Sequence, residues 1–294
     1  MRVLVGTLVT IEKEFEACVE SIARQTYRNY HHVVFRDLES LAGQRMLYAT
    51  FMERAAEFDL LMRVDADMVI ENPQFFAWIV EQMTRRPSIE MLSIDIHDYF
   101  TDRLITGLHT YRSTVTFSVD DPIQPDRVVV AKQHQQIERS AIGFGVRHCT
   151  DPSPLQALHY GIHRGVKLRE WMRRGESSHA SWYASVIRQT WRNYVRRRER
   201  RVGLAVLGAE LGIRGVFAID HLNHHTELPK RVLRATEHLD DAAIAQMVGR
   251  LQRETWGFLP ARLRTYALRW NGVRAFSRTD VDALLGGCAG SEPT

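Results

Sequence analysis

Apolar and polar positions alternate along the first hundred residues in blocks that predict strands and helices in turn. Four short apolar runs have the length of buried strands: residues 2–6, 32–35, 58–64 and 90–94. Between them, apolar residues recur every three or four positions, as in Phe15, Cys18 and Ile22, which is typical of an amphipathic helix. This alternation predicts an α/β fold, a mostly parallel mixed sheet with helices on both faces.

The remainder of the chain has fewer regular periods. Ser153-Pro154 predicts a helix start, a helix is expected from about Ser181, and 216–219 predicts a last strand. The tail, residues 240–285, has the spacing of two or three amphipathic helices. We therefore predict one domain over residues 1–230, with halves 1–100 and 101–230, followed by a helical C-terminal extension, 231–294.

Composition limits the class of protein. The 294 residues, 45% of them hydrophobic, suffice for one large core. No apolar run approaches the roughly 18 residues of a membrane-spanning helix, and the first residues lack a signal-peptide layout. Three scattered cysteines, Cys18, Cys149 and Cys288, favour a reducing compartment, so we expect a cytoplasmic protein. The absence of a glycine-rich phosphate loop argues against P-loop enzymes and dinucleotide oxidoreductases.

The strand predicted at 58–64 ends in Asp65-Ala66-Asp67. Two carboxylates at the end of a buried strand are costly unless something neutralises them. Mg²⁺ and Mn²⁺ prefer oxygen ligands and often bridge carboxylates to phosphates, so the pattern indicates a divalent-metal site. An acidic turn is the alternative interpretation. Strand ends at Gly6 and Asp37 are expected at the same edge of the sheet, in one crevice with the acidic pair.

The segment CVESIARQTYRNYHHVVFRD, residues 18–37, followed by RVDADM, resembles the opening of family 2 glycosyltransferases. Those enzymes have the GT-A fold, whose Asp-x-Asp holds a divalent metal on the diphosphate of a sugar donor. Over about the first hundred residues, the resemblance implies Mn²⁺ or Mg²⁺ on Asp65 and Asp67. It also implies nucleotide-sugar-binding roles for four residues: Thr7, Asp37, Arg45 and Asp65. A turn role for Asp37 and an exposed helical position for Arg45 remain open.

The resemblance implies two further site residues. Inverting members carry their general base just before a helix, which corresponds here to Asp151; such a base takes the proton from the acceptor hydroxyl. The alternatives are a capping role for Asp151 or a base at Asp95, Asp98 or Asp102. A late histidine commonly completes the metal site, and imidazole suits transition metals. His224 is the preferred candidate, with His221 and His225 left open.

Arginines and aromatic residues are concentrated at residues 182–201, which end in VRRRERR. This helix indicates an anionic partner, such as a membrane surface or the acceptor; a solvated basic face is the alternative. No nucleic-acid-binding motif accompanies it, so we expect no nucleic acid partner.

Together with the family resemblance, these features predict a metal-dependent glycosyltransferase of polysaccharide biosynthesis, expected to be inverting, with a retaining mechanism left open. It would move a sugar from a nucleotide-diphosphate sugar to a glycan, lipid-linked or other hydroxyl acceptor. Two alternatives stay open: an inactive GT-A-fold scaffold attached through the arginine-rich helix to an anionic polymer or membrane, and a nucleotidyltransferase.

Overall fold

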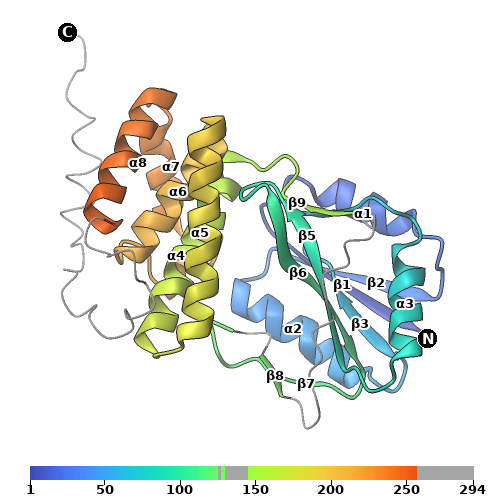
Figure 1. The fold of residues 1–294 in the computed structure, drawn as a ribbon. Helices are drawn as coiled ribbons and strands as arrows, with labels where there is room; N and C mark the ends of the chain where they lie inside the picture. Colours follow the sequence, from blue (N-terminus) through green and yellow to red (C-terminus); the bar gives the residue numbers. More distant parts are fainter. Residues whose placement is uncertain (125–126, 130–144, 257–294) are drawn as a thin grey trace. The chain divides into compact units, whose positions relative to one another are not determined.

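The structure is a computed structural model that describes residues 1–124, 127–129 and 145–256. The chain divides into two compact units, Met1–Pro152 and Ser153–Thr294, and we consider each by itself (Figure 1). The first unit is α/β and the described part of the second is helical. The boundary predicted after residue 230 falls inside helix α7 (Glu227–Thr236), because the helical unit already begins at Ser153.

Seven strands of the first unit form one mixed sheet in the order β2-β1-β3-β6-β5-β9-β4. The strands are β1 (Val3–Val9), β2 (Tyr30–Arg36), β3 (Leu60–Arg63), β4 (Met68–Ile70), β5 (Met91–Asp98), β6 (Arg103–Arg112) and β9 (Val146–His148). The pairs β1–β2, β1–β3 and β5–β9 are parallel, and the β3–β6, β5–β6 and β4–β9 pairs are antiparallel. A separate hairpin pairs β7 (Thr116–Ser118) with β8 (Arg127–Val129).

Helices cover both faces of the sheet, as predicted. Helices α1 (Phe15–Ala23) and α3 (Phe75–Arg85) pack on the face that carries Val3, Val5 and Met62. Helix α2 (Ser40–Glu53) packs with β7 on the opposite face, against Leu4 and Leu61. Alternate residues of β1 and β3 thus enter different cores, as the two-residue period of a strand requires. Both strands are buried on both sides, which explains their continuous apolar runs.

The sheet must curl, because β3 and β4 are close in sequence and far apart in strand order. Only residues 64–67 connect them, although β6, β5 and β9 lie between them in the sheet. Four inter-strand spacings in a flat sheet would span about 19 Å. The five Cα steps of this connection reach at most about 18 Å. The curl brings the Asp65-Ala66-Asp67 turn to the place where β9 meets β4.

The second unit is built on two helices whose backbones touch. Helices α4 (Pro154–Arg173) and α6 (Arg200–Ile213) meet at glycines, and a Cβ added at Gly161 would lie 1.8 Å from the Ala205 carbonyl oxygen. Around them lie α5 (Ser177–Arg197), the short helix η1 (Ile219–Leu222), α7 and α8 (Asp241–Trp256). Within the residues described, none of the helices is both long enough and apolar enough to cross a membrane.

Several predicted boundaries shift. The first strand continues to Val9 rather than ending at Gly6, because Thr7 to Val9 pair in register with β2. The strand predicted at 216–219 is wrong, since Ile219 begins η1. The helix from Ser153-Pro154 is confirmed, and Ser153 forms a capping box with Gln156. Helix α8 lies within the predicted C-terminal extension, and residues 257–294 fall outside the described part.

Candidate functional site

Asp67 is held in place by the turn that follows β3. The Met68 N–H donates to the Asp65 carbonyl at 2.9 Å, which closes the turn. Ala66 and Met68 on either side are buried, so the alternation leaves the Asp67 side chain 17% exposed. The turn therefore holds the Asp67 carboxylate partly buried, while the neighbours Ala66 and Met68 anchor the chain in the core.

His148 and Cys149 reach Asp67 from the end of β9, although Cys149 follows Asp67 by 82 residues in the sequence. In the sheet, β9 is the direct neighbour of β4, the strand that begins after Asp67. β9 pairs with both β4 and β5, which fixes His148 opposite Met68 and Asp98. Cys149 has a positive φ of 56°, and its N–H donates to the Asp67 carbonyl at 2.8 Å. A non-glycine residue rarely adopts this conformation, so the surrounding contacts must hold it there.

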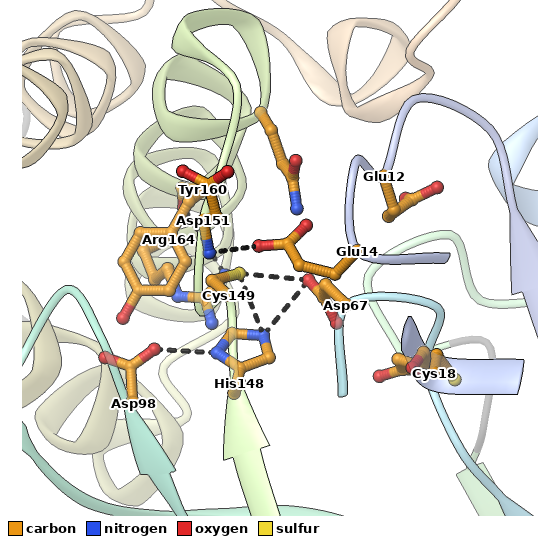
Figure 2. A network of polar contacts seen from close by, with 12 residues as sticks. Glu12, Glu14, Cys18, Asp67, Asp98, His148, Cys149, Asp151, Tyr160 and Arg164 are labelled. Carbon is orange, nitrogen blue, oxygen red and sulfur yellow. Dashed lines mark hydrogen bonds and ion pairs between the residues drawn. The ribbon is translucent and has the colours of Figure 1, made fainter. Parts of the chain in front are cut away.

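The side chains of Asp67, His148 and Cys149 point toward one another (Figure 2). Cys149 Sγ lies 3.1 Å from Asp67 Oδ2, and His148 Nε2 lies 3.2 Å from the same oxygen. The third side of the triangle, from Sγ to Nε2, is 3.6 Å. An oxygen, a nitrogen and a sulfur thus converge on one point.

A buried carboxylate orients the imidazole from behind. Asp98 is fully buried, and its Oδ1 lies 2.7 Å from His148 Nδ1 (Figure 2). The other oxygen of Asp98 accepts a hydrogen bond from the Thr101 N–H at 2.7 Å. Because a carboxylate accepts, Nδ1 carries the proton and Nε2 is turned toward Asp67 and Cys149.

The electrostatics of this site favour a cation. Burial, reinforced by the Asp67 charge, raises the pKa of Glu12 to about 7. Burial, with Asp67 and Asp65, raises the pKa of Cys18 to about 12. Burial and Asp67 also raise the pKa of the Cys149 thiol well above its ordinary value. These acids keep their protons chiefly because they are buried, and the negative charge of Asp67 adds to the effect.

The pKa of His148 is likewise raised well above its ordinary value. Burial alone would lower it, but the charge of Asp67 and the hydrogen bonds to Asp67 and Asp98 outweigh that effect. The protons on these groups thus offset negative charge that a bound divalent cation would offset in their place. Carboxylate and imidazole suit Mn²⁺ better than Mg²⁺, which favours all-oxygen sites, so these residues fit the expected kind of metal.

The structure brings together only some of the residues predicted to bind the nucleotide-sugar donor. Asp65 lies in the same turn as Asp67, but its Oδ1 pairs with Arg63 Nε at 2.7 Å. Thr7 is fully buried within β1, and its hydroxyl lies 3.0 Å from His32 Nε2. Asp37 is exposed directly after β2, with a positive φ of 55°. Arg45 lies on α2 and contacts the Val119 carbonyl and Asp120.

Asp151 lies two residues beyond Cys149, at the end of the first unit. Its side chain is 54% exposed and forms an ion pair with Lys13. Its backbone N–H donates to Glu14 Oε1 at 2.9 Å. The predicted base is therefore an accessible carboxylate on the same segment as the Asp67 cluster. Its rival Asp98 is instead fully buried behind His148.

His224, the predicted late metal ligand, belongs to the second unit. Its ring centroid lies 4.4 Å from that of His159, another histidine of that unit. Burial, with His224 beside it, lowers the pKa of His159 to about 3. The histidine that the structure places against Asp67 is His148, which the sequence reasoning missed. The signal available in the sequence was a histidine and a cysteine just before the predicted base Asp151.

The comparisons with known proteins leave the family open. No protein-family model matches the chain, and no curated protein matches it. Among the 18 matching chains of solved structures is A197 from STIV, at 11% sequence identity and a TM-score of 0.30. That match covers 38% of this chain and 65% of the other, so this chain spans less than two thirds of A197.

Proposed function

We propose that the chain is a metal-dependent glycosyltransferase of the GT-A type, which transfers a sugar from a nucleotide-diphosphate sugar to a hydroxyl acceptor with inversion. The observation that carries the proposal is the approach of His148 Nε2 to Asp67 Oδ2, at 3.2 Å. Asp67 is the second acid of the Asp-x-Asp sequence after a buried strand, and an imidazole beside it completes a divalent-cation site. The α/β unit with helices on both faces of its sheet agrees with this class.

In this proposal Asp67 and His148 hold the cation, and Asp98 fixes the orientation of the imidazole. The cation, Mn²⁺ more readily than Mg²⁺, would offset the negative charge that grows on the departing nucleotide diphosphate. Asp37 is exposed after β2 and is available to accept hydrogen bonds from the base or ribose. Asp151 accepts the proton of the acceptor hydroxyl, for which it must be ionised and accessible.

A further part of the proposal concerns the arginine-rich helix. Along α5, Arg188, Arg192 and Arg196 are exposed at four-residue spacings that place them on one helical face. Trp182, earlier on the same helix, is also exposed. Cationic side chains with an exposed tryptophan suit the headgroup layer of an anionic membrane, so we assign this face to peripheral contact with anionic lipid. Such a location would bring the enzyme to a lipid-linked acceptor.

The proposal is tested by measuring hydrolysis of nucleotide-diphosphate sugars by the full chain with Mn²⁺. We expect slow release of free sugar that chelation abolishes and that Asp67→Asn abolishes without unfolding the chain. Glu81→Gln, an exposed acid of α3, is the matched control and should keep full activity. Full activity in excess chelator, or in Asp67→Asn, would overturn the metal-dependent function. Tight nucleotide-sugar binding without turnover would instead favour the inactive scaffold.

A further inference from the structure

Cys149 gives the metal centre a donor that an oxygen-only site lacks. Its sulfur faces the same point as Asp67 Oδ2 and His148 Nε2, and the ligand atoms of all three residues lie within 4.8 Å of one another. Cys149 is 1% exposed and His148 is 8% exposed, whereas the Asp67 side chain is 17% exposed. The cluster is therefore enclosed on the sulfur and nitrogen sides and reachable on the carboxylate side.

The size of the triangle matches a tetrahedral metal. With metal–sulfur bonds of about 2.3 Å and metal–nitrogen or metal–oxygen bonds of about 2.1 Å, neighbouring ligands of Zn²⁺ lie about 3.4 to 3.6 Å apart. The observed separations are 3.1 Å for sulfur to oxygen, 3.2 Å for nitrogen to oxygen and 3.6 Å for nitrogen to sulfur. A cation of this size needs only small side-chain movements to bind all three atoms.

A second, independent observation supports a metal. Metal-bound histidines usually donate their other ring nitrogen to a carboxylate, which fixes the ring and raises its basicity. Buried Asp98 does this for His148, at 2.7 Å, and is itself held by the Thr101 N–H. The backbone conformation also contributes. With its positive φ, Cys149 donates its N–H to the Asp67 carbonyl, which keeps the two residues together.

We propose that Asp67, His148 and Cys149 form a three-ligand site for a thiophilic divalent cation of the Zn²⁺ and Co²⁺ class. The site leaves one coordination position for solvent or substrate oxygen. On binding, Cys149 gives its thiol proton to solvent and coordinates as the thiolate, while His148 binds through neutral Nε2. Affinity should follow the order of the divalent transition metals, with Zn²⁺ well above Mn²⁺ and Mg²⁺ weakest. The inference rests on the proposed function only in taking this cation as the one that serves the sugar donor.

The test is a Co²⁺ titration of the metal-free full-length chain. We expect one equivalent to bind with a thiolate-to-cobalt charge-transfer band in the near ultraviolet. Zn²⁺ should displace it at equal concentration, whereas Mg²⁺ should not. Cys149→Ser should abolish the band, while Cys18→Ser, another buried thiol of the same unit, and Cys288→Ser should retain it. Bound Co²⁺ without the band, or an unchanged band in Cys149→Ser, would overturn the site.

Should Cys149→Ser fail to fold, X-ray absorption at the zinc edge of the unmodified chain gives the same answer. We expect one sulfur and the remaining ligands nitrogen or oxygen; a shell without sulfur rejects the proposal. The two proposals fail separately. A cobalt–thiolate band in a chain that hydrolyses no nucleotide sugar with any metal keeps the site and rejects the glycosyltransferase. Metal-dependent hydrolysis without a sulfur ligand keeps the enzyme and rejects this site.

Discussion

Asp98 and His148 form a buried carboxylate–imidazole pair, in which His148 Nδ1 donates a hydrogen bond to Asp98 Oδ1 at 2.7 Å. The pair joins two strands that are parallel neighbours, since Asp98 ends β5 and lies beside His148 of β9 in the register. The pair therefore fixes both the tautomer and the orientation of the His148 imidazole. The consequence for metal affinity can be measured.

Asp98→Asn should weaken Co²⁺ or Zn²⁺ binding about 10- to 100-fold, as for loss of an outer carboxylate partner of a histidine ligand. The neutral amide supports the imidazole less well than the carboxylate does. Isothermal titration calorimetry on the metal-free chain measures the change. Asp95→Asn, on the same strand and bonded to Thr106, is the control and should bind as the unmodified chain does. Reduced stability with unchanged metal affinity would leave Asp98 a purely structural residue.

Glu12 predicts how stability depends on pH. Its pKa is raised from 4.5 to about 7 in the folded chain, by burial first and then by Asp67, so folding favours the protonated acid. Its contribution is intact below about pH 4.5 and is lost as the pH rises through about 7. Glu12→Gln removes this titration. The variant should therefore match the parent near pH 4.5 and exceed it at pH 8.

Denaturant unfolding of both chains at pH 4.5, 6 and 8 measures the effect. Its upper limit is about 3 kcal/mol in unfolding free energy, and partial exposure of the side chain reduces it. Added divalent metal should shrink the difference, because a cation at Asp67 offsets the charge that raises the pKa of Glu12. A constant difference across this pH range would contradict the raised pKa.

Helix α1 and the sheet show which parts of the fold could be predicted from the sequence and which could not. Phe15, Cys18 and Ile22, three residues of α1 predicted to line a helical face, are all buried, because helical periodicity is a local property. The strand order could not be predicted from the sequence. Strand β6 lies between β3 and β5 and pairs with both in antiparallel orientation, and its pairing with β3 depends on contacts far apart in sequence. We therefore expected a mixed sheet that is mostly parallel, whereas three of the six strand pairs of this sheet are antiparallel.

The residues of the candidate site likewise divide into those that could be predicted from the sequence and those that could not. Asp67 was predicted because carboxylates at the end of a buried strand are costly unless something neutralises them, and because the Asp-x-Asp resembles that of family 2 glycosyltransferases. His148 was not, because β9 has only three residues, too few to show a period, and its partners β4 and β5 are remote in sequence. The late histidine expected at His224 came from the family resemblance rather than from any pattern near it.

The basic face of α5 predicts that its arginines contribute to lipid binding and that Arg200, the first residue of α6, does not. Changing Arg188 and Arg192 to Gln should weaken binding to phosphatidylserine vesicles, most strongly at low salt, because their exposed charges are screened by added ions. Arg200→Gln should leave vesicle binding unchanged and lower stability, since Arg200 bonds to the Leu239 and Thr236 carbonyls at 2.6 and 2.7 Å. Sedimentation with vesicles at two salt concentrations distinguishes them. Equal binding by all three chains would make the face a solvated surface.

Asp151 carries the prediction about catalysis. Asp151→Asn keeps the shape of the side chain and the backbone hydrogen bond to Glu14, so the fold should persist. The amide has no basic site for the acceptor proton, so turnover should fall about 10²- to 10⁴-fold, as for removal of a positioned general base. Donor affinity and metal affinity should stay the same, since neither requires this proton transfer. Single-turnover transfer and nucleotide titrations measure the two quantities separately.

The rival carboxylates supply the comparison. Asp95 accepts a hydrogen bond from Thr106 at 2.9 Å, and Asp102 lies 3.6 Å from His97, so both have partners unrelated to the Asp67 cluster. Asp95→Asn and Asp102→Asn should therefore keep turnover near that of the unmodified chain. Loss in either one, with full turnover in Asp151→Asn, would move the base to that residue. Full turnover in all three variants would exclude these carboxylates as the base and favour a retaining mechanism, because retention does not require this base.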